Sequence, residues 1–227
     1  MTESPSATLQ DAYRHATQQP QRLRWMEFFA VFLGVPVAIE WQILPNLPIP
    51  ILLVSAAFVY LMLRRDAQFD QRLLWSPHQA RVHLPAMLLR FLILGVLLTG
   101  AVWLFFPEKL FIFPRSRPAI WLMVMVLYPV LSVYPQEVIF RAFFFHRYAS
   151  LFRTPRAMVI ASGLAFGFAH IVFGAWISVA LSTAGGILFA RSYVRSSSLF
   201  LSVIEHALYG CLVFTIGLGQ FFYHGAR

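Results

Sequence analysis

Three ionisable side chains interrupt segments that are otherwise apolar enough to lie in a membrane: Glu137 within YPQEVIFR, His170 within FGFAHIVF and His206 within SVIEHALYG. An ionisable side chain at the centre of a spanning helix costs about 2.5–3.5 kcal/mol on insertion scales, so such residues usually face a protein interior and mark a functional site. One carboxylate and two imidazoles can form a general base, a zinc site or a proton relay. These three residues are therefore the candidate catalytic residues.

The composition indicates a chain that folds within a membrane. Of its 227 residues, 59% are hydrophobic and only 12% are charged, so it is far more apolar than a water-soluble domain of this size. The apolar segments lack the alternating pattern of barrel strands and approach the length of about 20 residues that a spanning helix needs. The sequence predicts an all-α, polytopic membrane bundle of about seven transmembrane helices. The predicted spans are 26–44, 49–63, 86–106, 119–140, 157–174, 175–190 and 198–218.

The basic residues predict that the N-terminus lies inside the cell. The formal net charge is +9, but the arginines lie between the apolar segments and form no dense run with interleaved aromatic residues, so no nucleic-acid partner is expected. With the N-terminus inside, most of these residues lie in the cytoplasm, as the positive-inside rule requires. They are Arg14, Arg22, Arg24, Arg64, Arg65, Arg72, Arg81, Arg141, Arg147, Arg153, Arg156, Arg191 and Arg195.

Four regions follow one another along the chain. Residues 1–25 form a cytoplasmic segment with no apolar core of a removable signal peptide, and 26–118 hold the first transmembrane helices and their connectors. Residues 119–218 carry the candidate site, and 219–227 form a short C-terminal tail. The lone Cys211 excludes an intramolecular disulfide or a cysteine metal cage.

The spacing of the three candidate residues predicts that they lie at one depth. Glu137 lies 17 residues before a predicted turn at Thr154, and His170 lies 16 residues after it. At about 1.5 Å per residue, both are roughly 25 Å from the turn, and His206 is about 12 Å from the cytoplasmic end of its span near Ser198. The three can therefore meet in the cytoplasmic half of the bilayer if the hairpin tip projects into the cytosol. The tip would carry Arg141, His146, Arg147, Arg153 and Arg156 into water.

Several neighbours are candidate supporting residues. Arg141 follows Glu137 by four positions and so shares its helix face, where the pair could keep the carboxylate ionised or could simply hold the helix in place. Phe166 precedes His170 by one turn, so its ring can pack beside the imidazole and limit its water. His170 alone would more often be a buried histidine bonded to a neighbouring helix.

The last two apolar helices carry further signals. Glu205 precedes His206, and two adjacent ionisable groups are hard to bury without a purpose. Gly163 and Gly167 form a GxxxG pattern, which predicts close helix packing. Arg90 lies near the end of a span and is predicted to be an interfacial anchor.

The order of QEVIFR, FGFAH and EHALYG on three late helices resembles the CPBP family. This family comprises the type II CAAX prenyl proteases and the bacteriocin-processing or immunity (Abi-like) proteins. Its pattern is EExxxR, then FxxxH, then a histidine followed four residues later by Asn or a similar polar residue. The resemblance covers about residues 119–218, and the matching positions are Arg141, Phe166, His170 and His206.

The resemblance implies a glutamate-dependent intramembrane endopeptidase. Glutamate and histidine would activate a water that attacks the peptide carbonyl, while the later histidine and asparagine would stabilise the oxyanion. It implies no obligatory cofactor, a membrane-associated protein or peptide as substrate, and a bacterial cytoplasmic (inner) membrane as the location. Nothing in the sequence implies a prenylated substrate.

Two positions depart from the family pattern. Gln136 stands where the first glutamate is expected, and because a glutamine cannot take a proton from water, Glu137 would have to act as the base. Gly210 stands at the final polar position, so oxyanion stabilisation would depend on His206, with Tyr209 or a water as a helper.

Three alternatives to a metal-free protease remain. Gln136 and Gly210 favour a catalytically silent membrane binding or immunity protein of the same fold. A transporter or proton relay would use the same groups but would show paired broken helices in repeated halves. Two histidines and a glutamate could also hold zinc with one position open for water, although the sequence contains no HExxH.

Overall fold

The protein is a bundle of helices. The structure is a computed structural model that describes residues 20–45 and 47–222, and no strand occurs in these residues, which confirms the predicted all-α fold. In chain order the elements are α2 (Gln21–Phe29), η1 (Ala30–Gly34), α3 (Val35–Glu40), α4 (Pro48–Arg65), η2 (Gln71–Leu74), α5 (Pro77–Phe105), η3 (Pro107–Lys109), α6 (Ile112–Ser116), α7 (Pro118–Tyr128), η4 (Pro129–Val133), α8 (Tyr134–Glu137), η5 (Val138–Phe143), α9 (Phe144–Arg147), η6 (Ala149–Leu151), α10 (Pro155–Phe168), η7 (Ala169–Phe173), α11 (Trp176–Ser196), α12 (Leu199–Thr215) and η8 (Leu218–Phe222).

Among the described residues, five helices are long and apolar enough to cross a membrane, so the chain is an integral membrane protein. α12 is also apolar but has only 17 residues. α2, η1 and α3 follow one another without a break but are not among the five. The total of seven spans and the N-in orientation therefore stay predictions. The five are Pro48–Arg65, Pro77–Phe105, Pro118–Arg147, Pro155–Phe173 and Trp176–Ser196.

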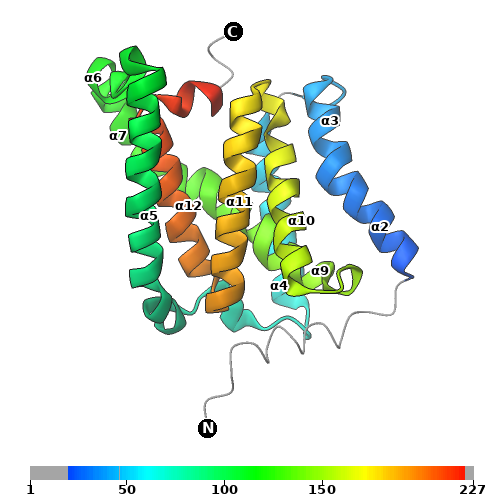
Figure 1. Cartoon of the computed structure of the whole chain (residues 1–227). Coiled ribbons are helices and arrows are strands. Elements are labelled where there is room, and N and C mark those ends of the chain that lie inside the picture. The colour runs from blue at the N-terminus through cyan, green and yellow to red at the C-terminus, as the bar shows by residue number, and fades with distance from the viewer. Residues whose placement is uncertain (1–19, 46, 223–227) are drawn as a thin grey trace.

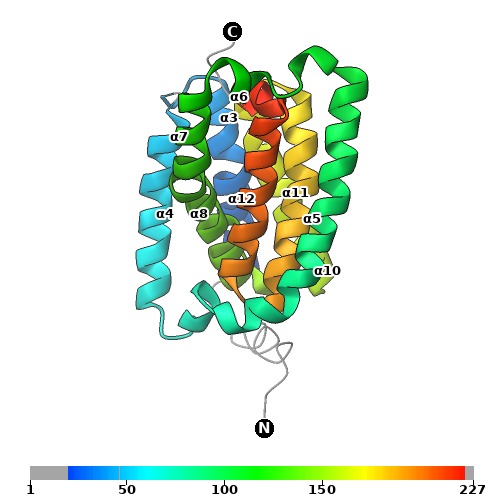
Figure 2. The same ribbon diagram turned by 90° about the vertical axis from the view of Figure 1, so that its left-hand side faces the viewer.

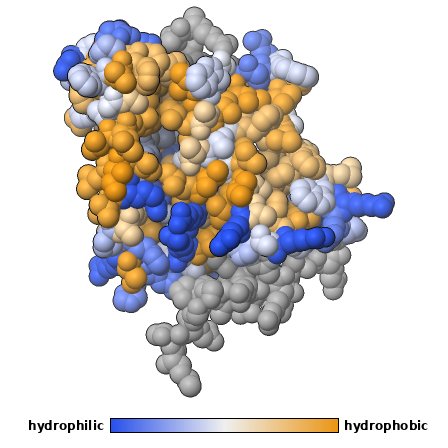
Figure 3. Space-filling view, in the orientation of Figure 1, coloured by the Kyte–Doolittle hydropathy of each residue, from blue (hydrophilic) through white to orange (hydrophobic). Residues whose placement is uncertain are grey.

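The helices run up and down, so that alternate connections gather at opposite ends of the bundle (Figure 1). One end holds the connections 65–77, 147–155 and 196–199, and the first two of these carry Arg65, Arg72, Arg147 and Arg153. In the space-filling view, hydrophilic residues gather towards this same end, while much of the face above them is hydrophobic (Figure 3). The grouping is the one that the charge pattern predicts for a cytoplasmic end.

α12 lies among the helices that carry the candidate residues. In Figure 2 it stands between the α7–α8 segment and α5, with α11 behind it. α10 and α11 pack against each other, and α11 in turn packs against α12. Side chains from distant parts of the sequence therefore converge on α12.

Two glycines permit the close approach of α10 to α11, as the GxxxG pattern predicts. A Cβ atom on Gly163 would lie 2.8 Å from the backbone nitrogen of Ile187, and one on Gly167 would lie 2.9 Å from the Cα of Thr183. Both distances are shorter than real Cβ contacts, so neither position accepts a larger residue without movement of the helices. This contact holds the helix that ends beside His170.

We expect Gly163→Ala to destabilise the bundle by about 1–3 kcal/mol, because the added methyl group forces α10 and α11 apart. Gly100→Ala is the matched control, since a Cβ atom at Gly100 has no neighbour within 4 Å. The control should keep or slightly raise the melting temperature, because alanine favours helix over glycine. Thermal unfolding of both variants in one detergent checks the prediction, and equal melting temperatures would contradict it.

Candidate active site

The helix that carries Glu137 contains two π-helical segments, η4 and η5. Pro129 begins the first of them and lacks an N–H for the helix ladder. In a regular helix of about 100° per residue, Tyr128 and Glu137 would point in opposite directions, because they are nine positions apart. The i→i+5 bonds of η4 add a residue to the turn and rotate the later residues back. Both side chains can therefore reach the same residue on α12.

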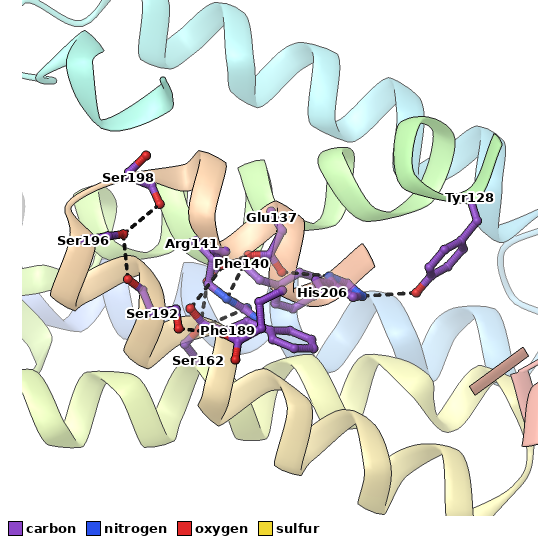
Figure 4. Close-up of polar contacts among 12 residues, drawn as sticks. Tyr128, Glu137, Phe140, Arg141, Ser162, Phe189, Ser192, Ser196, Ser198 and His206 are labelled. Carbon is purple, nitrogen blue, oxygen red and sulfur yellow. Dashed lines mark hydrogen bonds and ion pairs between the residues drawn. The ribbon is translucent and has the colours of Figure 1, made fainter. Parts of the chain in front are cut away.

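Glu137 lies at the centre of a buried polar network (Figure 4). Its Oε1 is 2.9 Å from Nδ1 of His206, and its Oε2 is 3.3 Å from Nε of Arg141. The hydroxyl of Ser202 also donates to Oε2. The carboxylate is an acceptor, so Nδ1 of His206 carries the hydrogen, and in the neutral ring Nε2 keeps its lone pair.

Arg141 lies inside the bundle with an exposed fraction of 0%. The prediction that the hairpin tip carries it into the cytosol is therefore wrong, whereas the predicted pairing with Glu137 is confirmed. Its Nη1 lies 3.3 Å from both the Phe140 carbonyl and the Ser162 hydroxyl, and its guanidinium lies 5.0 Å from the centre of the Phe166 ring. These contacts replace water around a charge that would otherwise be costly to bury.

Two aromatic rings hold the imidazole of His206. Phe189 of α11 stacks on it with ring centres 4.6 Å apart and planes inclined by 15°. Phe166 of α10 meets it edge to face, with centres 5.3 Å apart. On the far side of the imidazole, Nε2 lies 3.2 Å from the hydroxyl oxygen of Tyr128. His206 is thus fixed by Glu137 through one nitrogen and faces Tyr128 with the other.

His170 lies in η7, just after α10, and the Phe166 ring separates it from His206 and Glu137. Its Nδ1 is 2.7 Å from the carbonyl oxygen of Phe166, so this nitrogen is the donor. Its ring centre is 4.8 Å from that of Phe166, which therefore contacts both imidazoles. The structure brings Glu137 and His206 together directly and places His170 behind Phe166. Both histidines use Nδ1 for orientation and leave Nε2 for chemistry.

Zinc is the metal alternative that the sequence leaves open. Within residues 20–45 and 47–222, no group of three or more His, Cys, Asp or Glu side chains could hold a metal ion. His170 is turned towards a backbone carbonyl, and Nδ1 of His206 is bonded to Glu137.

Gln136 and Tyr209 lie outside the Glu137 network. Gln136 is partly exposed, and its Nε2 donates to the Ser132 hydroxyl at 2.7 Å. The ring of Tyr209 packs against Phe91, with centres 5.1 Å apart. Tyr128, which the sequence patterns do not single out, is the tyrosine at hydrogen-bond distance from His206.

Glu205, which precedes His206 on α12, belongs to a second buried network. Its Oε1 is 2.5 Å from Nη2 of Arg90, and its Oε2 accepts from the Ser192 hydroxyl at 2.5 Å. Arg90, which the sequence predicts to be an interfacial anchor, also joins α5 to α11 and α12. Through these contacts Glu205 links the three helices.

Comparison with known proteins identifies one family. Residues 117–212 match the family model described as type II CAAX prenyl endopeptidase Rce1-like. The matched range contains Tyr128, Glu137, Arg141, His170 and His206. No curated protein and no solved structure matches the chain.

Proposed function

We propose that this chain, whose residues 117–212 belong to the type II CAAX prenyl endopeptidase Rce1-like family, is an intramembrane endopeptidase that activates water with Glu137 and His206. The observation that carries the proposal is the buried pair of Glu137 Oε1 and His206 Nδ1, which are 2.9 Å apart. Such a pair makes an imidazole a competent general base, because the carboxylate fixes its tautomer and stabilises the imidazolium that forms.

The geometry favours Glu137 acting through His206 rather than taking the proton itself. Both carboxylate oxygens have partners, in His206, Arg141 and Ser202. Nε2 of His206 lies 3.2 Å from the Tyr128 hydroxyl, which can rotate and leave the lone pair of Nε2 to water. We therefore assign proton transfer to Nε2 and orientation to the carboxylate.

The reaction then follows the general course of peptide hydrolysis. Nε2 of His206 takes a proton from water while the water oxygen attacks the peptide carbonyl carbon, and the carbonyl oxygen becomes an oxyanion. The imidazolium next gives this proton to the peptide nitrogen, the C–N bond breaks, and a carboxyl group and an amine leave. His170 is the second imidazole, and since its Nδ1 donates to the Phe166 carbonyl, we propose that its Nε2 accepts a hydrogen bond from water in the site.

The surroundings of the site suit this chemistry. Phe166 and Phe189 cover His206 and exclude bulk water, which strengthens the electrostatic effect of Glu137 on the imidazolium. We propose a membrane-associated protein or peptide as the substrate, cut in the cytoplasmic half of the bilayer. The bacterial cytoplasmic membrane is the proposed location.

Profiling of protein termini tests the proposal and identifies the substrate. Membranes are prepared from cells that carry the native chain or His206→Gln at matched expression, and new N- and C-termini are compared. We expect termini that occur only with the native chain, because glutamine cannot accept a proton as Nε2 does. Purified native protein should cleave the identified substrate equally well with and without a metal chelator.

Identical termini in both membranes would contradict the proposal. They would favour a catalytically silent membrane binding or immunity protein of the same fold. Loss of cleavage in chelator, restored by zinc, would instead show that a metal takes part.

A further inference from the structure

The second ring nitrogen of His206 faces Tyr128, the last residue of α7. Oη of Tyr128 lies 3.2 Å from Nε2, and the two rings are nearly perpendicular at 80°. The Tyr128 ring also packs edge-on against Phe214, with centres 5.2 Å apart. Packing therefore holds this hydroxyl beside the nitrogen to which we assign proton transfer (Figure 4).

Gly210 provides the space that Tyr128 occupies. Gly210 lies four residues after His206 on α12, so the two positions share a helix face. A Cβ atom at Gly210 would overlap the Tyr128 ring edge and hydroxyl and would lie 2.6 Å from Cζ. Real Cβ atoms do not approach so closely. Tyr128 thus reaches His206 because position 210 has no side chain.

We infer that Tyr128 is a further catalytic residue, whose hydroxyl binds the oxyanion together with His206. This inference rests on the proposed peptidase function. In the resting site the hydroxyl donates to the lone pair of Nε2. When substrate and water enter, the hydroxyl turns away from Nε2 and donates to the substrate carbonyl oxygen. The freed lone pair of Nε2 then takes the proton from water, and the hydroxyl stays on the oxyanion that forms. The tyrosine keeps its own proton throughout the reaction.

Tyr128→Phe tests the role of the hydroxyl, because it keeps the ring above Gly210. We expect kcat to fall by about 10²–10³-fold, which is typical for one oxyanion donor, while KM changes little. The melting temperature should stay near that of the native protein. Tyr60→Phe, which removes a phenolic hydroxyl from α4, is the matched control and should keep the native kcat.

Two single variants and their double variant test the relation between Tyr128 and Gly210. Gly210→Asn alone should be destabilised, because the new side chain collides with Tyr128. Tyr128→Ala should be stable enough to study but as slow as Tyr128→Phe or slower. The double variant Tyr128→Ala with Gly210→Asn should melt above the Gly210→Asn variant and cleave at least tenfold faster than Tyr128→Ala. The asparagine would then supply the missing donor from the opposite helix.

The outcomes separate this inference from the proposed function. If the native chain cleaves and Tyr128→Phe has the same kcat, the role of Tyr128 is overturned and the proposed peptidase function stands. A double variant that folds well but is no faster than Tyr128→Ala also counts against the inference. If terminal profiling finds no cleavage by the native chain, both the inference and the proposed function are overturned.

Discussion

Glu137→Gln should lower kcat for peptide cleavage by about 10³–10⁴-fold, the size of effect expected when an imidazole base loses its orienting carboxylate. The new amide can donate from its NH₂ group to Nδ1 of His206. Nδ1 is then an acceptor, so the neutral imidazole carries its hydrogen on Nε2. In that tautomer Nε2 cannot accept a proton from water. KM should change little, because the substitution leaves the size of the side chain unaltered. Single-turnover cleavage of the identified substrate measures the change.

Glu27→Gln is the matched control for this experiment. Glu27 also loses an ion pair when it becomes glutamine, since its carboxylate lies 2.8 Å from Nη2 of Arg147. Cleavage by this variant should remain at the native rate, because the pair lies away from His206 and holds α2 to the end of α9. A native rate in Glu137→Gln would remove Glu137 from the mechanism.

Gln136 provides a second comparison. It hydrogen-bonds to Ser132 on the preceding turn and makes none of the contacts of the Glu137 network. Gln136→Glu should therefore leave Glu137 paired with His206 and retain cleavage. If it instead restored cleavage to a Glu137→Gln protein, the base would belong to the position where the family pattern has its first glutamate.

Local signals allowed the sequence to predict the hairpin correctly. The turn before Pro155 was expected because proline starts helices well, and α10 does begin at Pro155. Thr154 completes the turn, since its hydroxyl accepts from the Ala157 N–H at 3.1 Å. Such signals depend on neighbours in the chain, so the sequence alone is enough to read them.

The partners of the charged groups could not be predicted in the same way. Arg90 and Glu205 are 115 positions apart, and nothing in either segment shows which opposite charge lies nearby. Arg141 was correctly paired with Glu137 by its spacing, yet the same residue was also placed in water. Its burial depends on Ser162 and Phe166, which belong to another helix.

Tyr128 was missed for a different reason. A straight helix directs it away from Glu137, and the π-helical segment that brings both towards α12 has no clear signal in the sequence beyond Pro129. The importance of Gly210 was missed with it, because the absence of a side chain has meaning only once the neighbouring ring is located. The site therefore required the structure at the points where helix geometry departs from the regular period.

Arg141→Leu should destabilise the protein by about 3–5 kcal/mol, the usual cost of removing one partner from a buried ion pair. The substitution leaves the carboxylate of Glu137 buried without its guanidinium, although Ser202 and His206 still contact it. It also removes the cation from above the Phe166 ring. Chemical unfolding in detergent measures the loss, and Arg72→Leu is the control. Arg72 pairs with Asp70 at 3.0 Å, but its side chain is 82% exposed, so its removal should cost at most about 1 kcal/mol.

The double variant Glu137→Gln with Arg141→Leu shows whether charge is the cause. Once the carboxylate is neutral, the missing guanidinium matters less, so the double variant should be more stable than Arg141→Leu alone. If the two variants unfold at the same denaturant concentration, the loss comes from packing around Phe140 and Ser162 rather than from the buried charge. The double variant should remain inactive in either case, because His206 still lacks the carboxylate that sets its tautomer. Stability and cleavage are thus separable at this site. In the proposed mechanism Arg141 permits a buried glutamate, and that glutamate makes His206 a base.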